Sequence, residues 1–105
     1  EKGTKRAWYR YVIRTRERNP LFNYLRETFR STPRLKPAIH YPVPLPCFSA
    51  FQSGYIKGSF PDAEKASSEI ISLPLNDYMS TKDVEMVCEA AKTFFTRRAD
   101  PQVLR

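Results

Sequence analysis

The pattern of apolar and polar residues predicts three elements in the first 41 positions. Residues 7–15, AWYRYVIRT, alternate and are rich in aromatic and β-branched side chains, which predicts a strand. Asn19 followed by Pro20 has the form of a helix start, with an N-cap and a proline in the first turn. Apolar residues follow at helical spacing, so we expect a helix that ends near Arg30. Residues 36–41 predict a short second strand.

The second part of the chain begins with residues 42–61, whose prolines and glycines predict a long irregular loop. Residues 62–72 predict a helix with acidic residues in its first turn, and residues 73–75 a short extended segment. The run from Ser80 to Asp83 fits a capping box that opens a last helix. That helix has the strongest apolar periodicity in the chain, formed by Val84, Val87, Cys88, Ala91, Phe94 and Phe95.

This order of elements predicts the fold class. Strand, helix, strand, long loop, helix, extended segment and helix pack most simply as a small sheet with helices on one face, which is an α+β fold. The chain has 105 residues and 41% hydrophobic content, enough for one compact domain. No apolar run approaches the roughly 20 residues of a membrane span. We therefore expect a cytoplasmic protein with no contact to a membrane.

The two cysteines, Cys47 and Cys88, have neither a CxxC partner nor a histidine at metal-ligand spacing, so no metal site is predicted. Cys88 lies within the apolar stripe of the last helix. We expect both to be reduced thiols that pack as small apolar groups. A disulfide between them is the alternative, and it requires an oxidising compartment.

Motifs for catalysis are scarce. The chain has one histidine and three glycines, and it contains no P-loop, GxGxxG, HExxH or GxSxG motif. By itself it is a poor candidate for an enzyme. The histidine, His40, stands in the stretch AIHYPVPLPCFSAF, where prolines stiffen the backbone and aromatic residues are frequent. Both a buried structural crossing and a wall of a ligand site fit this stretch.

The net charge of +7 lies in the first third of the chain, where residues 1–40 contain 11 Lys and Arg against 3 Asp and Glu. Arg10 and Arg14 alternate there with aromatic residues on the predicted first strand. Such a strand can bind phosphates and stack bases. A small basic module that binds nucleic acid or another polyanion is therefore an alternative function, although no RNA-binding motif accompanies the charge.

Three segments resemble one known family. They are IHYPVPLP at 39–46, GYIKGSFPDAEKASSEIISLPL at 54–75 and STKDVEMVCEAAKTFF at 80–95. Together they look like the C-terminal part of the DegT/DnrJ/EryC1/StrS aminotransferases, and the strand and helix before them resemble that family's lead-in. The resemblance divides the chain into a frayed lead-in (1–6), an aminotransferase-like C-terminal small domain (7–96) and a polar tail (97–105).

The resemblance implies a fold-type I enzyme that uses pyridoxal phosphate (PLP) to move an amino group onto a nucleotide-linked keto-sugar. Such enzymes are homodimers, and their cofactor lysine lies in a large domain that this chain lacks. The resemblance therefore implies no cofactor bound by this chain alone and a missing large domain, on the same or another chain, as partner.

His40, Tyr41 and Pro42 match the family's H-Y-P segment, which implies a substrate-binding role for them. Pro46 stands where the family usually has a second histidine, so an altered substrate geometry is expected. A purely structural or dimerisation domain is a third hypothesis, and it predicts self-association through residues 42–61.

Overall fold

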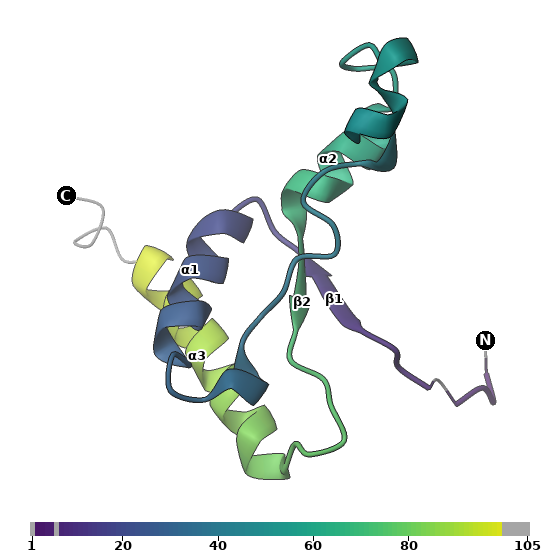
Figure 1. Ribbon diagram of the computed structural model, residues 1–105. Coiled ribbons are helices and arrows are strands. Elements are labelled where there is room, and N and C mark those ends of the chain that lie inside the picture. Colours follow the sequence, from purple (N-terminus) through teal and green to yellow (C-terminus); the bar gives the residue numbers. More distant parts are fainter. Residues whose placement is uncertain (1, 6, 100–105) are drawn as a thin grey trace.

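The structure, a computed structural model, describes residues 2–5 and 7–99. Strands and helices follow one another in it, so the predicted α+β fold is confirmed. In chain order they are β1 (Tyr11–Arg14), α1 (Arg18–Thr28), α2 (Pro61–Glu69), β2 (Ile70–Leu73) and α3 (Thr81–Ala99) (Figure 1). None of these described helices combines the length and the apolar character that crossing a bilayer requires. Of the expected polar tail, residues 97–99 belong to α3, and residues 100–105 lie outside the described residues.

β1 and β2 form a two-stranded antiparallel sheet, with Tyr11 opposite Leu73 and Arg14 opposite Ile70. The strand predicted over residues 7–15 is thus confirmed only in its second half. At its carboxyl end the register is fixed by two contacts with Glu69. Its carbonyl oxygen accepts the N–H of Thr15, and its carboxylate lies 2.7 Å from the guanidinium of Arg14.

The strand predicted over residues 36–41 is wrong. Only an isolated bridge forms there, in which the N–H and the carbonyl of Ala38 both bond to the backbone of Ser72. Prolines stand on either side, at positions 37 and 42, and they have no amide hydrogen to donate to a ladder. The segment crosses β2 at one point and then leaves the sheet.

The helix predicted over residues 62–72 ends three residues early, because α2 stops at Glu69. Ile70 and Ile71 are β-branched and continue directly into β2, where Ile71 is fully buried. The acidic first turn is confirmed by Asp62 and Glu64. β2 therefore continues directly from α2, with no loop between them.

α1 also begins differently from the prediction. It starts at Arg18, so Asn19 and Pro20 are its second and third residues, and no side chain caps it. The proline is tolerated there because the first N–H groups of a helix have no intrahelical acceptor. The first intrahelical bond runs from the N–H of Leu21 to the carbonyl of Glu17.

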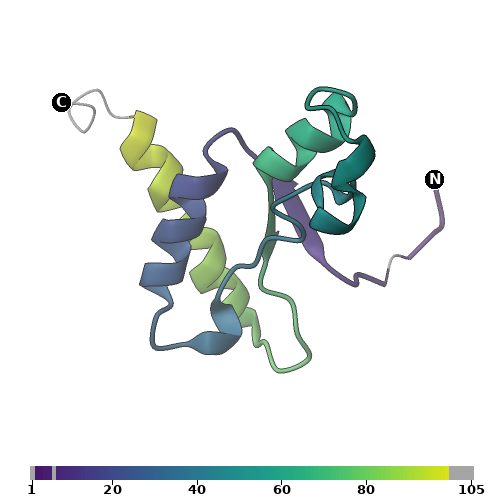
Figure 2. The ribbon, with the colours of Figure 1, turned by 45° about the horizontal axis from the view of Figure 1, so that its top comes forward.

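The core lies between α1, α3 and one face of β2, and Figures 1 and 2 show α1 and α3 side by side on one side of the strands. The ring of Tyr24 on α1 lies 5.5 Å from that of Phe94 on α3. Each fully buried leucine there stabilises the fold by about 1.5–3 kcal/mol. The buried apolar side chains are Leu21, Leu25, Phe29, Leu35, Ile71, Val87, Ala90 and Phe94.

α3 opens as predicted. The carboxylate of Asp83 accepts the N–H of Ser80 at 2.9 Å, and the hydroxyl of Ser80 accepts the N–H of Asp83 at 3.2 Å. The apolar stripe of this helix is buried only in part: Val87 and Phe94 belong to the buried core, whereas Val84 is half exposed. Cys88 is exposed, which corrects the prediction that its thiol is buried.

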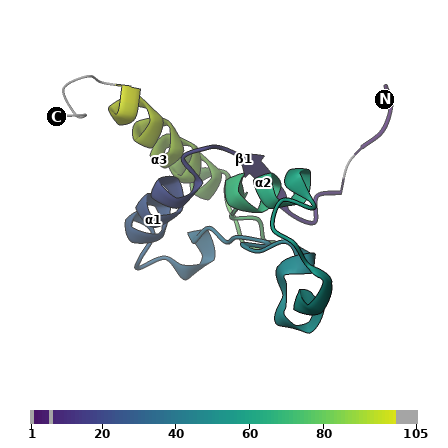
Figure 3. The same cartoon turned by 90° about the horizontal axis from the view of Figure 1, so that it is seen from above.

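Residues 42–60 form an arm that carries short 3-10 turns at Leu45–Cys47 and Ser49–Gly54 and no third strand, as the proline content predicts. The arm and α2 extend away from α1 and α3 (Figures 1 and 3). Several large apolar side chains of the arm are exposed, including Leu45 at 66% and Ile56 at 75%. Cys47 is half buried in the arm, and its thiol forms no disulfide bond within the described residues.

Candidate functional site

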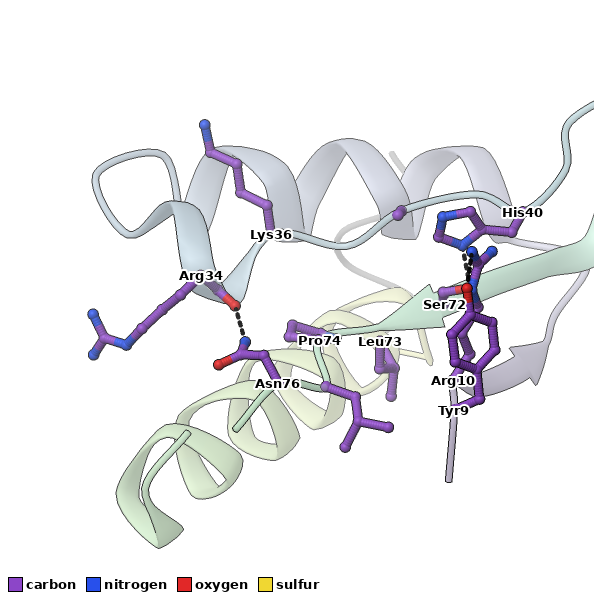
Figure 4. Close-up of a pocket in the computed structure, with 11 residues that line it drawn as sticks. Tyr9, Arg10, Arg34, Lys36, His40, Ser72, Leu73, Pro74 and Asn76 are labelled. Carbon is purple, nitrogen blue, oxygen red and sulfur yellow. Dashed lines mark hydrogen bonds between the residues drawn. The ribbon is translucent and has the colours of Figure 1, made fainter. Parts of the chain in front are cut away.

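A polar pocket of about 250 Å³ lies where three segments of the chain meet. The lead-in to β1 supplies Tyr9 and Arg10, and the end of β2 with the following loop supplies residues 72–76. The segment after α1 supplies Arg34, Lys36, Ala38 and His40. Figure 4 shows the pocket running along this last segment, with Asn76 at one end and His40 at the other. The sequence positions that build it are thus far apart along the chain.

His40 lies at one end of the pocket. Its Nδ1 is 2.9 Å from the hydroxyl oxygen of Ser72. Ser72 is only 5% exposed, and both its backbone groups bond to Ala38, the residue two positions before His40. The imidazole is therefore anchored to β2, and one ring nitrogen, Nε2, has no bonded partner within the described residues.

Arg10 and two tyrosines complete this end of the pocket. The guanidinium of Arg10 donates to the hydroxyl of Tyr9 at 3.2 Å, and it lies 4.8 Å from that ring and 5.9 Å from the ring of Tyr41. Hydrogen bonding to Tyr9 is the main cause that raises the pKa of Arg10. Tyr41 meets His40 edge to face at 5.7 Å. Arg10 thus brings a permanent positive charge beside His40.

The other end of the pocket is also basic but is organised differently. Arg34 pairs with Asp83 at 2.8 Å, and its carbonyl accepts a hydrogen bond from the amide of Asn76 at 3.1 Å. In Figure 4 the side chains of Arg34 and Lys36 point away from the pocket. No Asp or Glu is among the residues that line it. An anion entering the pocket would meet positive charge and no lining carboxylate.

Of the three residues predicted to bind substrate, the structure brings His40 into the pocket and Tyr41 against its ring. Pro42 is exposed and does not line the pocket, and Pro46 lies in the turn Leu45–Cys47 of the arm. Ser72 was not predicted as a neighbour of His40. A serine inside an apolar strand does, however, indicate that its hydroxyl has a hydrogen-bond partner. Arg10 was predicted only as a contact for nucleic acid or another polyanion.

The pocket does not fit PLP. That cofactor requires a lysine amine to bond covalently, an acid for the pyridine nitrogen and donors for the phosphate. The lysine that lines the pocket, Lys36, points out of it, and no carboxylate lines it. The described residues also contain no cluster of side chains able to hold a metal ion. Among the described residues, this pocket offers recognition groups without a cofactor site.

A second, larger groove of about 570 Å³ lies next to the polar pocket. The two share the segment Leu73–Asn76 as a common wall. No charged residue lines the groove, and its surface is almost entirely apolar. The residues that line it are Tyr11, Ile13, Leu73, Pro74, Leu75, Asn76, Met79, Val84, Val87 and Cys88.

The start of α2 is held by a third set of contacts. The carboxylate of Glu64 accepts the N–H of Gly58 at 2.9 Å and that of Phe60 at 3.3 Å. Gly58 has φ of +92°, a conformation that favours glycine. Hydrogen bonding to Cys47, followed by burial and by hydrogen bonding to Glu64, raises the pKa of Tyr55. These contacts hold the arm against the start of α2. They account for the conformation of the arm there, and no bound ligand is needed to explain it.

Comparison with known proteins gives consistent matches. The model of the DegT/DnrJ/EryC1/StrS aminotransferase family matches residues 1–92. A dTDP-3-amino-3,6-dideoxy-alpha-D-galactopyranose transaminase of Aneurinibacillus thermoaerophilus is 36% identical over 84% of the chain and 23% of its own length. A pleiotropic regulatory protein of Geobacillus stearothermophilus is 32% identical over 89% of the chain and 24% of its own length.

Among solved structures, the chain is similar to S. venezuelae DesV, crystallised in complex with a ketimine intermediate. The TM-score is 0.74 at 25% sequence identity, over 83% of the chain and 22% of DesV. The chain therefore spans about a quarter of the length of the proteins that it matches. The family match over residues 1–92 spans the sheet, α1, α2, the first part of α3 and every residue that lines the two pockets.

Proposed function

Because the chain belongs to the DegT/DnrJ/EryC1/StrS aminotransferase family, we propose that it forms one part of a PLP-dependent aminotransferase that acts on nucleotide-linked keto-sugars. In that enzyme it contributes to the substrate side of the site and not to the cofactor. The observation that carries this proposal is the polar pocket, which places Arg10 beside His40 and is lined by no carboxylate.

The pocket suits the anionic part of such a substrate. A nucleoside diphosphate carries negative charge on its phosphate oxygens, and arginine and imidazole N–H groups are strong donors to them. His40 and Arg10 would bind these oxygens, while Tyr41 offers an aromatic edge beside them. Pro42 would act indirectly, by fixing the backbone after Tyr41, because its ring does not line the pocket.

The rest of the enzyme must supply the cofactor site, and the apolar groove is the surface that we assign to it. A charge-free groove of this size beside half-exposed apolar residues is typical of a surface that another protein surface covers. The relatives carry about three quarters of their length outside the matched region, enough for the family's large domain. Homodimerisation, through the exposed apolar arm, completes the proposal.

The proposal predicts that the isolated chain binds dTDP weakly and not thymidine, which has the same base and no phosphate. In two-dimensional NMR spectra, dTDP should shift the signals of His40 and Tyr41. Replacing Arg10 with alanine should weaken this binding about tenfold, since a charge-assisted hydrogen bond is lost.

Arg30→Ala is the matched control for charge, because Arg30 is exposed in the turn after α1 and, among the described residues, its side chain pairs with Glu27 alone. It should leave dTDP binding unchanged. Equal weakening by the two substitutions would show that the net charge and not the pocket attracts the nucleotide. Absence of any shift at His40 with millimolar dTDP would refute the substrate role.

The alternative function, a small module that binds nucleic acid or another polyanion, has less support than the aminotransferase role. Arg14, one of the two arginines expected to bind phosphates on the first strand, is paired with Glu69 at 2.7 Å. Arg34 is paired with Asp83, and Arg98 with Glu17. Part of the basic excess is thus neutralised within the fold.

A further inference from the structure

We propose that Ser72 is a positioning residue that fixes the tautomer of His40. Its hydroxyl donates to Nδ1, so that Nε2 carries the proton and donates to an oxygen of an anionic ligand. The tautomer follows from this chain alone. The ligand part rests on the proposed function, and the experiment below separates the two.

Ser72 is placed rigidly. It lies in the middle of the short sheet, opposite Val12 of β1, and on its other side it exchanges two backbone hydrogen bonds with Ala38, at 2.8 and 3.0 Å. It is 5% exposed. With both of its backbone groups bonded to Ala38 and its strand paired with β1, Ser72 leaves its hydroxyl little freedom other than rotation about one bond. The position of its oxygen is therefore set by the sheet.

The direction of the hydrogen bond follows from counting donors. A serine hydroxyl has one hydrogen, and leaving a buried hydroxyl hydrogen without an acceptor costs free energy. The partner of the Ser72 hydroxyl in the described part of the chain is Nδ1 of His40, at 2.9 Å. Nδ1 can accept this hydrogen only if it carries none itself. In a neutral imidazole the proton then resides on Nε2.

The remaining N–H is well placed to act with Arg10. Figure 4 shows Tyr9, Arg10, His40 and Ser72 gathered at one end of the pocket. Arginine offers only donors, and the Nε2–H tautomer of His40 offers one more. This end of the pocket has two kinds of hydrogen-bond donor and no lining carboxylate. It therefore favours ligands that present acceptor oxygens. Phosphate oxygens of a nucleoside diphosphate are the class that fits.

The test uses the full chain with ¹⁵N-labelled histidine. His40 is the single histidine, so the spectrum contains one pair of ring nitrogen signals. At mildly alkaline pH, where imidazole is neutral, we expect the proton on Nε2 and an Nδ1 signal displaced by the hydrogen bond. Ser72→Ala should remove that displacement, and Ser72→Thr, which retains a hydroxyl, should restore it. A proton on Nδ1 in the unaltered chain would overturn the inference.

The same variants are then titrated with dTDP. Ser72→Ala should weaken binding about threefold to tenfold, and Ser72→Thr should recover it, because one oriented donor is lost and regained. Equal dTDP affinity in Ser72→Ala and the unaltered chain would reject the positioning role while leaving the proposed function intact. If dTDP binds neither chain but the tautomer is as expected, the ligand assignment fails and the inference about the tautomer stands.

Discussion

The carboxylate of Asp83 joins two parts of the chain that lie far apart in sequence. It accepts the N–H and the hydroxyl of Ser80 at the start of α3, and it also accepts the guanidinium of Arg34 at 2.8 Å. These bonds, with those to Ser80 first, lower the pKa of Asp83 to about 2. Asp83 therefore takes part in the cap at the start of α3, and it also holds the segment around Arg34 that leads to the polar pocket.

The sign of the resulting pH dependence is fixed by this pKa. A carboxyl group whose pKa is lowered by folding stabilises the protein above its ordinary pKa of 3.8, and this stabilisation is lost as the pH falls towards 2. We predict that Asp83→Asn lowers the urea midpoint near neutral pH and reduces the further loss between about pH 4 and pH 2. Urea unfolding at several pH values measures both effects.

Glu85→Gln is the control for that experiment. It removes the same charge from the first turns of α3 at an exposed position. It should leave the acid dependence close to that of the unaltered chain, because Glu85 has no ion-pair partner among the described residues. Identical curves for Asp83→Asn and the unaltered chain would contradict the role assigned to the carboxylate.

At this scale, local contacts could be predicted and distant ones could not. The bond between Ser80 and Asp83 spans three positions, so the sequence pattern contains both partners. The bond between Ser72 and His40 spans 32 positions and depends on which strands pair. The residues next to His40 in the sequence do not indicate that Ser72 is its hydrogen-bond partner. The sequence therefore indicated His40 as a candidate site residue, but it did not indicate Ser72, which is hydrogen-bonded to the His40 imidazole.

At the scale of elements, the stripe of α3 shows why periodicity predicts a helix better than it predicts its packing. Apolar residues recur at helical spacing both where α1 covers them and where the groove leaves them open. The same spacing therefore predicted Val87 and Cys88 to be buried, and only Val87 is. Likewise, Ile70 and Ile71 fit a helical pattern, but pairing with β1 places them in a strand.

Two valines of α3 allow a direct test of this difference. Val87 is 4% exposed and Val84, one turn earlier, is 49% exposed. We predict that Val87→Ala lowers the free energy of unfolding by about 2 kcal/mol, because methyl groups are lost and a cavity remains. Val84→Ala should change it by less than about 0.5 kcal/mol. Both follow from urea unfolding of the isolated chain, and similar losses would mean that α1 and α3 pack differently.

At the scale of the whole molecule, the described part of the chain leaves two apolar regions uncovered. One is the groove beside β2, and the other is the arm of residues 42–60. The core between α1 and α3 stabilises the fold to which both regions belong, and the arm extends away from these two helices (Figures 1 and 3). The sequence predicted an α+β fold, but it could not show where uncovered surface would remain, since that depends on the final packing.

The groove should make the isolated chain associate with itself at high concentration. We predict that Val84→Glu, which places a charge on the wall of the groove, shifts this association to about tenfold higher concentration. Tyr78→Glu introduces the same charge at a residue that is 87% exposed and does not line the groove. Sedimentation velocity over a concentration series compares them. An equal effect of both changes would assign the association to net charge.

The wall that the two pockets share has a thermodynamic consequence. A ligand in the polar pocket and a surface in the apolar groove would both contact the segment Leu73–Asn76, which lines the two. Any displacement of this segment by one of them changes the free energy of binding the other. Such coupling is reciprocal, so a nucleotide that tightens the association of the chain with its partner must itself be bound more tightly, and by the same factor, once that partner is in place.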